Sequence, residues 1–354
     1  MELLFYFLIS LIAILISCIV FSNSVEWLGA RLNLSHGITG SLLAAVGTAL
    51  PETVVPLVAI FWGIDRYTLI KILTGSQDSL NSVSQISMGA IIGAPFMLST
   101  VAFFLVGLSS WLYFKTGRRK SKIINVDETL LERDLTFFII SFSLAFLAIL
   151  LSHFFHIVLA IVLVLLYFVY LYKTIKEETK GEYKGEELEG NLDPFFLTNI
   201  TKLKPTMFLI VLQLIISLFF LIFCAHHFVE VIKEVSTRLN FPVFIISLLL
   251  TPLATELPEK FNSWMWIRQK KDTLAIGNIS GALVFQSTFP VTIGLLFTSW
   301  HINSLVSYMT FTFCLVSALI VLIALKMKKL SYKIFLFCGI FYVIYLYLVL
   351  THYK

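Results

Sequence analysis

The segment TPLATELPEK, residues 251–260, stands in the middle of an apolar run that extends from Phe241 to Trp266. It contains two prolines, two carboxylates and a lysine, and a membrane-spanning helix seldom carries ionisable residues without a functional reason. Proline also removes a backbone donor and clashes with the preceding turn of a helix. The segment therefore predicts an interrupted helix that holds charge inside an apolar environment.

The composition of the whole chain places this segment in a membrane protein. The chain has 354 residues, of which 58% are hydrophobic and 13% are charged, and its mean hydropathy is +0.91. Soluble domains carry about 25% charged residues, so the composition excludes an ordinary soluble domain. Because a helix needs about 20 apolar residues to cross the hydrocarbon, we predict an all-α integral membrane protein with ten transmembrane helices. The predicted spans lie near residues 2–22, 38–62, 84–112, 135–151, 155–172, 206–227, 241–266, 273–298, 303–325 and 332–351.

Lysine and arginine are distributed unevenly among the predicted loops. If the N-terminus is outside, the inward loops carry 20 of these residues and the outward segments carry 5. The run KTGRRKSK at residues 115–122 contributes most to this bias, and cytoplasmic loops are typically the basic ones. We therefore predict a multi-pass protein of the cell membrane with both termini outside. The net charge of +5 then needs no nucleic-acid partner.

The chain contains an internal repeat. LLAAVGTALPE at residues 42–52 matches LLTPLATELPE at residues 249–259 in six of eleven positions, and GAIIGA at 89–94 matches GNISGA at 277–282 in four of six. Each copy occupies the second and third spans of a five-span half. Because five is odd, the two halves enter the membrane from opposite sides, which is the geometry of an inverted-repeat transporter.

The repeat divides the chain into three parts. Residues 1–172 form the first five-span repeat, with its motif at 42–98, and residues 205–354 form the second, with its motif at 249–286. Residues 173–204 are predicted to be a cytoplasmic loop, because a segment so rich in charge buries too little apolar surface to fold.

The repeated motif predicts a cation site near the middle of the membrane. Each copy combines a helix-breaking proline with a threonine and a glutamate, and broken helices expose backbone carbonyls that serve hard cations well. Buried carboxylates are costly in the bilayer unless they are paired, so we expect a positive ion to bind between them. The predicted ligands are Thr48, Glu52, Thr255 and Glu259, and the predicted helix breaks are Pro51, Pro258 and Pro252.

A glycine pair follows each copy of the motif. Gly89 with Gly93, and Gly277 with Gly281, form two G-x-x-x-G motifs, which leave one face of a helix bare for close packing. We expect these glycines to press the third and eighth spans against the cation site.

Lys260 adds a positive charge to the second copy. Glu256 precedes it by four residues, a spacing that places both side chains on one face of a helix. We predict that the two residues form an ion pair, which would leave Glu259 for the ion. The alternative is that Lys260 extends its ammonium towards the inner surface of the membrane.

The motif pair resembles the alpha repeats of the sodium/calcium exchanger branch of the calcium:cation antiporters. The resemblance rests on GTALPE (47–52), on ATELPE (254–259) and on the G-x-x-x-G helix that follows each. It implies alternating access, in which the first and sixth spans slide past a fixed core. It also implies a Ca²⁺ site built around the two glutamates and the two threonines.

The chain departs from that family at several positions. The family usually has serine after the motif threonine, where this chain has Ala49 and Glu256, and its glycine-rich helices usually read G-S-N-I-x-N or G-S-N-I-x-D. Here Ala94 and Ala282 replace the serine, and Leu98 and Gln286 replace the last amide or acid. We expect Glu256, Gln286 and Asn278 to supply some of the missing ligand atoms.

The predicted function is secondary active antiport of Ca²⁺ against a monovalent cation, with Na⁺ implied by the resemblance. The alternatives are an H⁺-coupled exchanger and a degenerate cation-binding protein that does not transport. A membrane enzyme using Glu52 and Glu259 as acid and base would need a nucleophile or a phosphate site, so we predict no catalytic residues. We expect inorganic cations and the lipid bilayer as partners, no cofactor, and a monomer.

Overall fold

The computed structural model describes residues 2–31, 45–63, 82–178, 194–202, 204–300 and 304–352. Within these ranges the chain is helical and has no strand; one isolated bridge joins Ile123 to Ser331. The helices are α1 (Glu2–Arg31), α2 (Ala45–Gly63), α4 (Ser82–Met97), the π-helix η2 (Leu98–Ala102), α5 (Phe103–Lys115), α6 (Glu128–Ala148), α7 (His153–Glu178), α8 (Phe196–Thr201), α9 (Met207–Leu239), α10 (Val243–Thr255), α11 (Leu257–Arg268), α12 (Asp272–Gln286), α13 (Phe289–Phe297), α14 (Leu305–Lys326) and α15 (Tyr332–His352).

Seven helical segments in the described ranges are long and apolar enough to cross a membrane. Two shorter apolar helices, Glu52–Phe61 and Val243–Leu253, lie in α2 and α10. The prediction of an all-α membrane protein with several spans is therefore confirmed. The seven segments are Phe5–Val25, Ser84–Lys115, His153–Lys176, Met207–Leu239, Asp272–Phe297, Leu305–Lys326 and Tyr332–His352.

Helix occupies most of each predicted span, but the predicted end of the sixth span is wrong. We placed this end at residue 227, whereas α9 continues to Leu239. The extra turns bury one face, which includes Phe228 and Ile232, and expose a charged face. On the exposed face Glu234 pairs with Arg238 at 2.5 Å one turn later, a spacing that supports a helix. Asn240 then adopts the left-handed conformation and ends the helix, as a C-terminal cap does.

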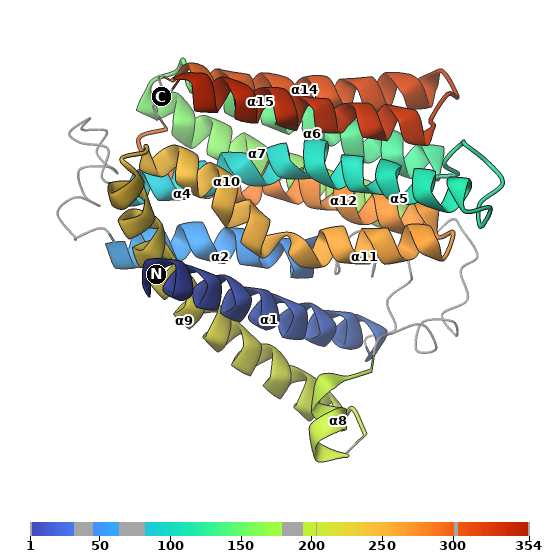
Figure 1. Cartoon of the computed structure of the whole chain (residues 1–354), viewed down its shortest axis with the longest axis horizontal. Coiled ribbons are helices and arrows are strands. Elements are labelled where there is room, and N and C mark those ends of the chain that lie inside the picture. Colours follow the sequence, from blue (N-terminus) through green and yellow to red (C-terminus); the bar gives the residue numbers. More distant parts are fainter. Residues whose placement is uncertain are drawn as a thin grey trace.

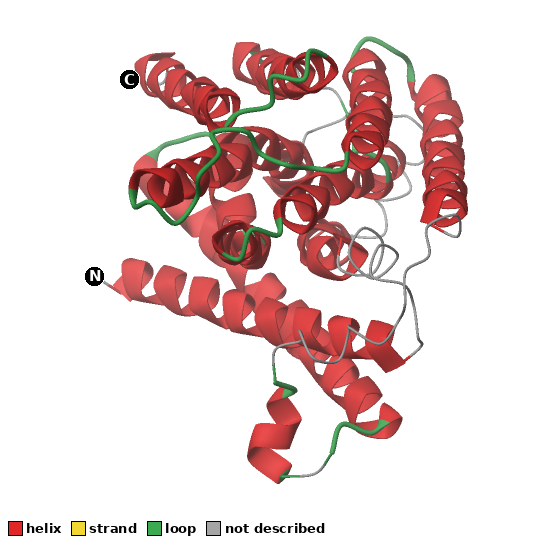
Figure 2. Ribbon diagram, turned by 90° about the vertical axis from the view of Figure 1, so that its right-hand side faces the viewer, coloured by secondary structure: helices red, strands yellow, loops and turns green. Residues whose placement is uncertain are grey.

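The helices form a layered bundle. The helices α1 and α9 pack against one another along one side of the molecule, and α14 and α15 lie on the opposite side (Figure 1). The view turned by 90° shows the same separation (Figure 2). The motif-bearing helices α2, α4, α10, α11 and α12 lie between these two sides, so the repeated segments meet in the interior. Both chain ends lie at the same end of the bundle (Figure 1).

The first glycine pair brings two backbones into contact. A Cβ atom built on Gly89 would lie 2.4 Å from the carbonyl oxygen of Phe244, and one built on Gly93 would lie 2.3 Å from that of Leu248. Pro252 lies inside α10 four residues after Leu248 and cannot donate the helical hydrogen bond to its carbonyl. The Leu248 carbonyl, which lacks its usual helical donor, therefore faces Gly93. Only glycine lets α4 approach this carbonyl so closely.

The second glycine pair lies on α12 and packs differently. A Cβ atom on Gly277 would meet the side chain of Leu130 at 3.4 Å, an ordinary contact. Gly281 is buried in the same helix. The close backbone approach expected of both pairs is therefore shown by the pair on α4 and not by Gly277.

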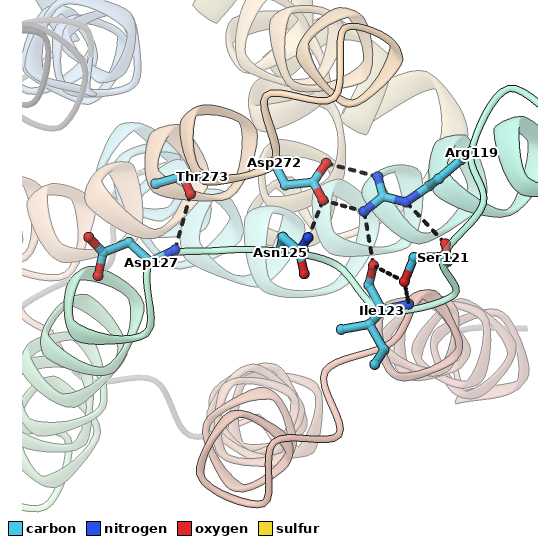
Figure 3. A network of polar contacts seen from close by, with 7 residues as sticks. All are labelled: Arg119, Ser121, Ile123, Asn125, Asp127, Asp272 and Thr273. Atoms are coloured by element: carbon cyan, nitrogen blue, oxygen red, sulfur yellow. Dashed lines mark hydrogen bonds and ion pairs between the residues drawn. The ribbon is translucent and has the colours of Figure 1, made fainter.

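A basic loop fastens the start of α12. In the loop after α5, Arg119 donates to both carboxylate oxygens of Asp272 (Figure 3), one of them at 2.8 Å. The amide of Asn125 donates to the same carboxylate at 3.0 Å, and the amide of Asp127 donates to the hydroxyl of Thr273 at 3.1 Å. Asp272 also lies in the first turn of α12, where a negative charge is favourable. The loop thus holds the N-terminus of α12 in place.

We predict that Gly93→Ala destabilises the protein, because its methyl group would overlap the backbone of α10. The free energy of unfolding should fall by about 1–3 kcal/mol, as expected for overpacking. Gly277→Ala is the matched control and should be close to neutral, because its methyl group meets only the Leu130 side chain at 3.4 Å. Thermal unfolding of both purified variants measures the difference, and equal melting temperatures would contradict this account of α4 packing.

Candidate cation-binding site

The interrupted helix predicted from residues 251–260 lies between α10 and α11. Helix α10 ends at Thr255, Glu256 leaves the helical conformation with φ −94° and ψ 7°, and α11 begins at Leu257. Proline is favoured in the first turn of a helix because its missing amide would have no helical partner there, and Pro258 occupies that place in α11. The C-terminal end of one half-helix therefore meets the N-terminal end of the next inside the protein.

The two prolines of this segment act differently. Pro252 is accommodated inside α10, so the predicted break at Pro252 is wrong. The interruption follows one turn later, where Pro258 restarts the helix.

The predicted break at Pro51 is also wrong. Helix α2 continues from Ala45 to Gly63 through this proline, because proline removes one helical hydrogen bond but can be accommodated as a bend. The side chains of Thr48, Pro51 and Pro258 lie outside the described residues.

Three carboxylates lie near the break. Glu52 reaches it from α2, and it interacts electrostatically with Glu259 and Glu256 and lies against Thr255. All four side chains are buried, with Glu52 exposed by 2% and the others by 0%. The structure therefore brings together both repeated glutamates and one repeated threonine, although Glu52 and Glu259 are 207 residues apart in the sequence.

Neither carboxylate oxygen of Glu52 accepts a hydrogen bond of normal geometry from the described residues. The Thr255 hydroxyl has one proton, which it donates to the carbonyl of Thr251 at 3.1 Å. A buried carboxylate without a donor is costly, and a cation supplies the missing partner. The donor set of carboxylates and hydroxyls is one that hard cations such as Ca²⁺ prefer.

Glu256 forms an ion pair with Lys260 within the break. The Lys260 Nζ lies 2.9 Å from Glu256 Oε2, with the lysine side chain exposed by 5%. The same Nζ donates to the carbonyl of Pro252 at 3.4 Å, and the Gln286 amide donates to Glu256 Oε1 at 3.5 Å. The lysine is therefore directed into the site and not towards the membrane surface.

Two amides of α12 also face this region of the protein. The Asn278 amide nitrogen lies 3.5 Å from the hydroxyl of Ser263 on α11, while Gln286 contacts Glu256. The side-chain carbonyl oxygens of both amides are buried and accept no hydrogen bond from the described residues. Because eight residues of helix span about 12 Å, the two amides serve different levels of the site and cannot bind one ion together.

The described residues offer no ready-made metal cluster. Within them, no three or more His, Cys, Asp or Glu side chains are grouped closely enough to hold a metal ion. A cation between Glu52 and Glu259 would therefore depend on neutral oxygens from threonine, amide and backbone groups. Such a ligand set is usual for Ca²⁺ and suits an ion that must also leave.

The helices that carry the glycine pairs are irregular at corresponding positions. After Pro95 in α4, the chain forms the π-helix Leu98–Ala102. After α12, Ser287 and Thr288 form a turn before α13 begins at Phe289. These two interruptions follow Gly89 and Gly277 at nearly the same distance, and π-helical turns are frequent at functional sites. The sequence signals for these interruptions are the prolines at 95 and 290.

Asp134 is a further buried acid that the sequence did not indicate. Asp134 on α6 is fully buried and pairs with Arg133 at 3.0 Å, and it accepts a hydrogen bond from Ser280 on α12 at 2.7 Å. The Arg133 guanidinium lies over the Tyr170 ring at 5.3 Å. The sequence ERD before an apolar run resembled the end of a loop, and only the fold showed that α12 covers it. Ser280 is thus directed towards α6.

Comparison with known proteins agrees with the repeated motif. The family model for sodium/calcium exchanger protein matches residues 2–176 and 209–351. An uncharacterized membrane protein of Methanocaldococcus jannaschii is 25% identical over 292 residues, which cover 82% of this chain and 81% of that protein.

Two solved structures share the fold. The H⁺/Ca²⁺ exchanger CAX is similar with a TM-score of 0.71 at 20% identity, over 99% of this chain and 85% of that chain. The sodium-calcium exchanger NCX_Mj is similar with a TM-score of 0.58 at 21% identity, over 97% of each chain. The architecture described above is therefore that of these membrane proteins.

We predict that Asp134→Asn destabilises the protein, because it removes the carboxylate that pairs with the buried Arg133 guanidinium at 3.0 Å. Breaking a buried pair in this way costs about 3–5 kcal/mol. Ser280→Ala, which removes one hydrogen bond to the same carboxylate, should cost less, about 1–3 kcal/mol. Thermal unfolding tests this order. The double change Arg133→Met with Asp134→Asn should recover part of the loss, and a double variant that is less stable than Asp134→Asn would contradict the pairing.

Proposed function

The chain belongs to the sodium/calcium exchanger protein family, and we propose that it is a secondary antiporter that exchanges Ca²⁺ for a monovalent cation by alternating access. One observation carries this proposal: Glu52 and Glu259, from different halves of the chain, are buried together at a broken helix. A carboxylate near the centre of a bilayer costs about 3 kcal/mol even on insertion scales. A pair of them is best explained by a divalent cation that binds and is released.

The ten-span inverted repeat belongs to the same proposal. It is supported by the similar interruptions after α4 and α12 and by the meeting of both motifs in the interior. We propose that α2, α4 and α10 to α13 form the fixed core, since glycine packing joins α4 to α10 and the Arg119–Asp272 pair holds α12.

We propose that α1 and α9 move together as the sliding unit. A polar cluster joins them, in which Gln213 of α9 donates to the carbonyl of Val20 at 3.2 Å, to Asn23 at 3.1 Å and to Ser24 at 2.9 Å. Hydrogen bonds of this kind hold helices together where no water competes. The pair also lies along one side of the bundle (Figure 1).

The identity of the coupling ion is the open part of this function. The two structural relatives are an H⁺/Ca²⁺ exchanger and a sodium-calcium exchanger. This chain has alanine at 94 and 282, so fewer hydroxyl ligands surround the site than the sodium/calcium exchanger resemblance implies. We propose transport without enzymatic catalysis, and we keep H⁺ as the alternative coupling ion.

We also propose the orientation with both termini outside. The chain ends lie at one end of the bundle and the basic loop that contains Arg119 lies at the other (Figure 1). The bias of 20 basic residues to 5 then assigns the loop to the cytoplasm.

We predict that Glu52→Gln and Glu259→Gln each reduce saturable Ca²⁺ flux to background in vesicles that contain the purified protein, because each removes one anionic ligand. Glu234→Gln makes the same chemical change at an exposed position of α9 and should retain flux. Imposed Na⁺, K⁺ and H⁺ gradients are compared in the parent protein to identify the coupling ion. Flux of parental size in either buried variant contradicts the site. Ca²⁺ binding without flux under any gradient supports the non-transporting alternative.

We predict that a cysteine introduced at Gly117 reacts with a membrane-impermeant thiol reagent only from the cytoplasmic side. Gly117 has positive φ and open space around its Cβ position, so it accepts a side chain sterically, at a backbone cost of about 1 kcal/mol. A cysteine placed before α1 should react only from outside. Labelling of both positions from the same side would contradict the three predicted spans that precede Gly117.

A further inference from the structure

The Lys260 ammonium occupies a position with the ligands of a cation site. Its Nζ contacts the Glu256 carboxylate at 2.9 Å and the Pro252 carbonyl at 3.4 Å. Carboxylate and backbone carbonyl oxygens are the groups that bind alkali and alkaline-earth cations in proteins. Broken membrane helices in particular present their C-terminal carbonyls to monovalent ions. The Lys260 ammonium therefore occupies the place at the end of α10 where the Glu256 and Pro252 oxygens would bind a cation if the lysine were absent.

A third group at this position lacks a partner. The side-chain carbonyl oxygen of Gln286 is buried and accepts no hydrogen bond from the described residues, although its amide nitrogen lies 3.5 Å from Glu256. Gln286 is 0% exposed, so bulk water does not compensate for the missing donor. Turning the amide would add a third oxygen to those of Glu256 and Pro252. The chain thus places the Glu256 and Pro252 oxygens around the ammonium, and a turned Gln286 amide adds an oxygen beside Glu256.

The charges of the site are consistent with this arrangement. If the carboxylates of Glu52, Glu256 and Glu259 are all ionised, they contribute three negative charges, and Lys260 contributes one positive charge, so the net charge is −2. One divalent cation, or two monovalent cations, balances this charge. Without the lysine, the same carboxylates would require one additional monovalent ion.

We propose that Lys260 is a tethered substitute for a monovalent cation, and that it fills an alkali-cation site formed by Glu256, Pro252 and Gln286. Its consequence for exchange rests on the proposed function: the chain should couple Ca²⁺ movement to one fewer monovalent ion than the same site would without the lysine. The occupancy itself depends only on the contacts of the ammonium. It can therefore be tested without transport.

The test compares the thermal stability of three purified proteins: the parent, Lys260→Met, and the double variant Glu256→Gln with Lys260→Met. Each is unfolded in chloride salts of Na⁺, K⁺, Li⁺ and N-methyl-D-glucamine at equal ionic strength. A cation that binds only the folded protein raises its melting temperature. The double variant keeps Glu52 and Glu259 but lacks the charge that Lys260 neutralises, so it controls for alkali ions bound elsewhere in the site.

We expect at least one alkali cation to raise the melting temperature of Lys260→Met by several degrees more than that of the parent or of the double variant. If Lys260→Met folds only when an alkali salt is present, the result also supports the proposal. If the alkali cations raise its melting temperature no more than that of the double variant, or if it folds in no salt while the double variant folds, the proposal is overturned.

A flux measurement separates this inference from the proposed function. In vesicles, Ca²⁺ exchange by Lys260→Met should fall several-fold in N-methyl-D-glucamine and recover with the alkali cation that stabilises it, whereas the double variant should show no such requirement. Absence of Ca²⁺ flux in the parent would refute antiport, while the stability comparison would still decide whether the lysine replaces a cation.

Discussion

The helix break between α10 and α11 is the feature on which the rest of the site depends. In a bilayer, backbone groups have no water to bond with, so an interrupted helix is tolerated only inside protein. Here the interruption places the carbonyl end of α10 beside the Lys260 ammonium and the amide end of α11 beside Glu259. Each charge thus lies at the helix end whose dipole favours it. Three acidic side chains, those of Glu52, Glu256 and Glu259, lie near the same break.

The surrounding helices hold this break in position through contacts of different kinds. Glycine on α4 allows the backbone of α10 to approach it, and Ser247 of α10 donates to the carbonyl of Ile86 at 2.6 Å. Helix α12 is fixed at its start by Asp272 and along its length by the hydrogen bond from Ser280 to Asp134. Backbone contact, buried charge and side-chain hydrogen bonds therefore all act on the helices that contribute to the site. None of these contacts requires the bound ion.

Electrostatics gives the two copies of the motif different roles. Both copies supply a glutamate to the same interior point, but only the second adds Glu256 and Lys260. The pair adds no net charge, since its members neutralise each other. The Lys260 ammonium nevertheless occupies the Glu256 carboxylate and the Pro252 carbonyl, which another cation could otherwise bind. Its cost is the desolvation of two charges, which the short contact and the helix end partly offset. The two copies of the motif thus differ in their side chains, because only the second carries Glu256 and Lys260.

The amino-acid sequence by itself determined the membrane class, the approximate positions of the helices and the two acidic motifs, because hydropathy and repetition are local properties of the chain. It also specified the spacing of Glu256 and Lys260, and the glycines that can pack closely. It did not reveal that α2 continues through Pro51, that α9 extends to Leu239, or that Asp134 is buried against Ser280. Those outcomes depend on which helix lies next to each residue. A proline can bend or end a helix, and an acid before an apolar run can face water or a neighbouring helix, so only the tertiary structure decided between them.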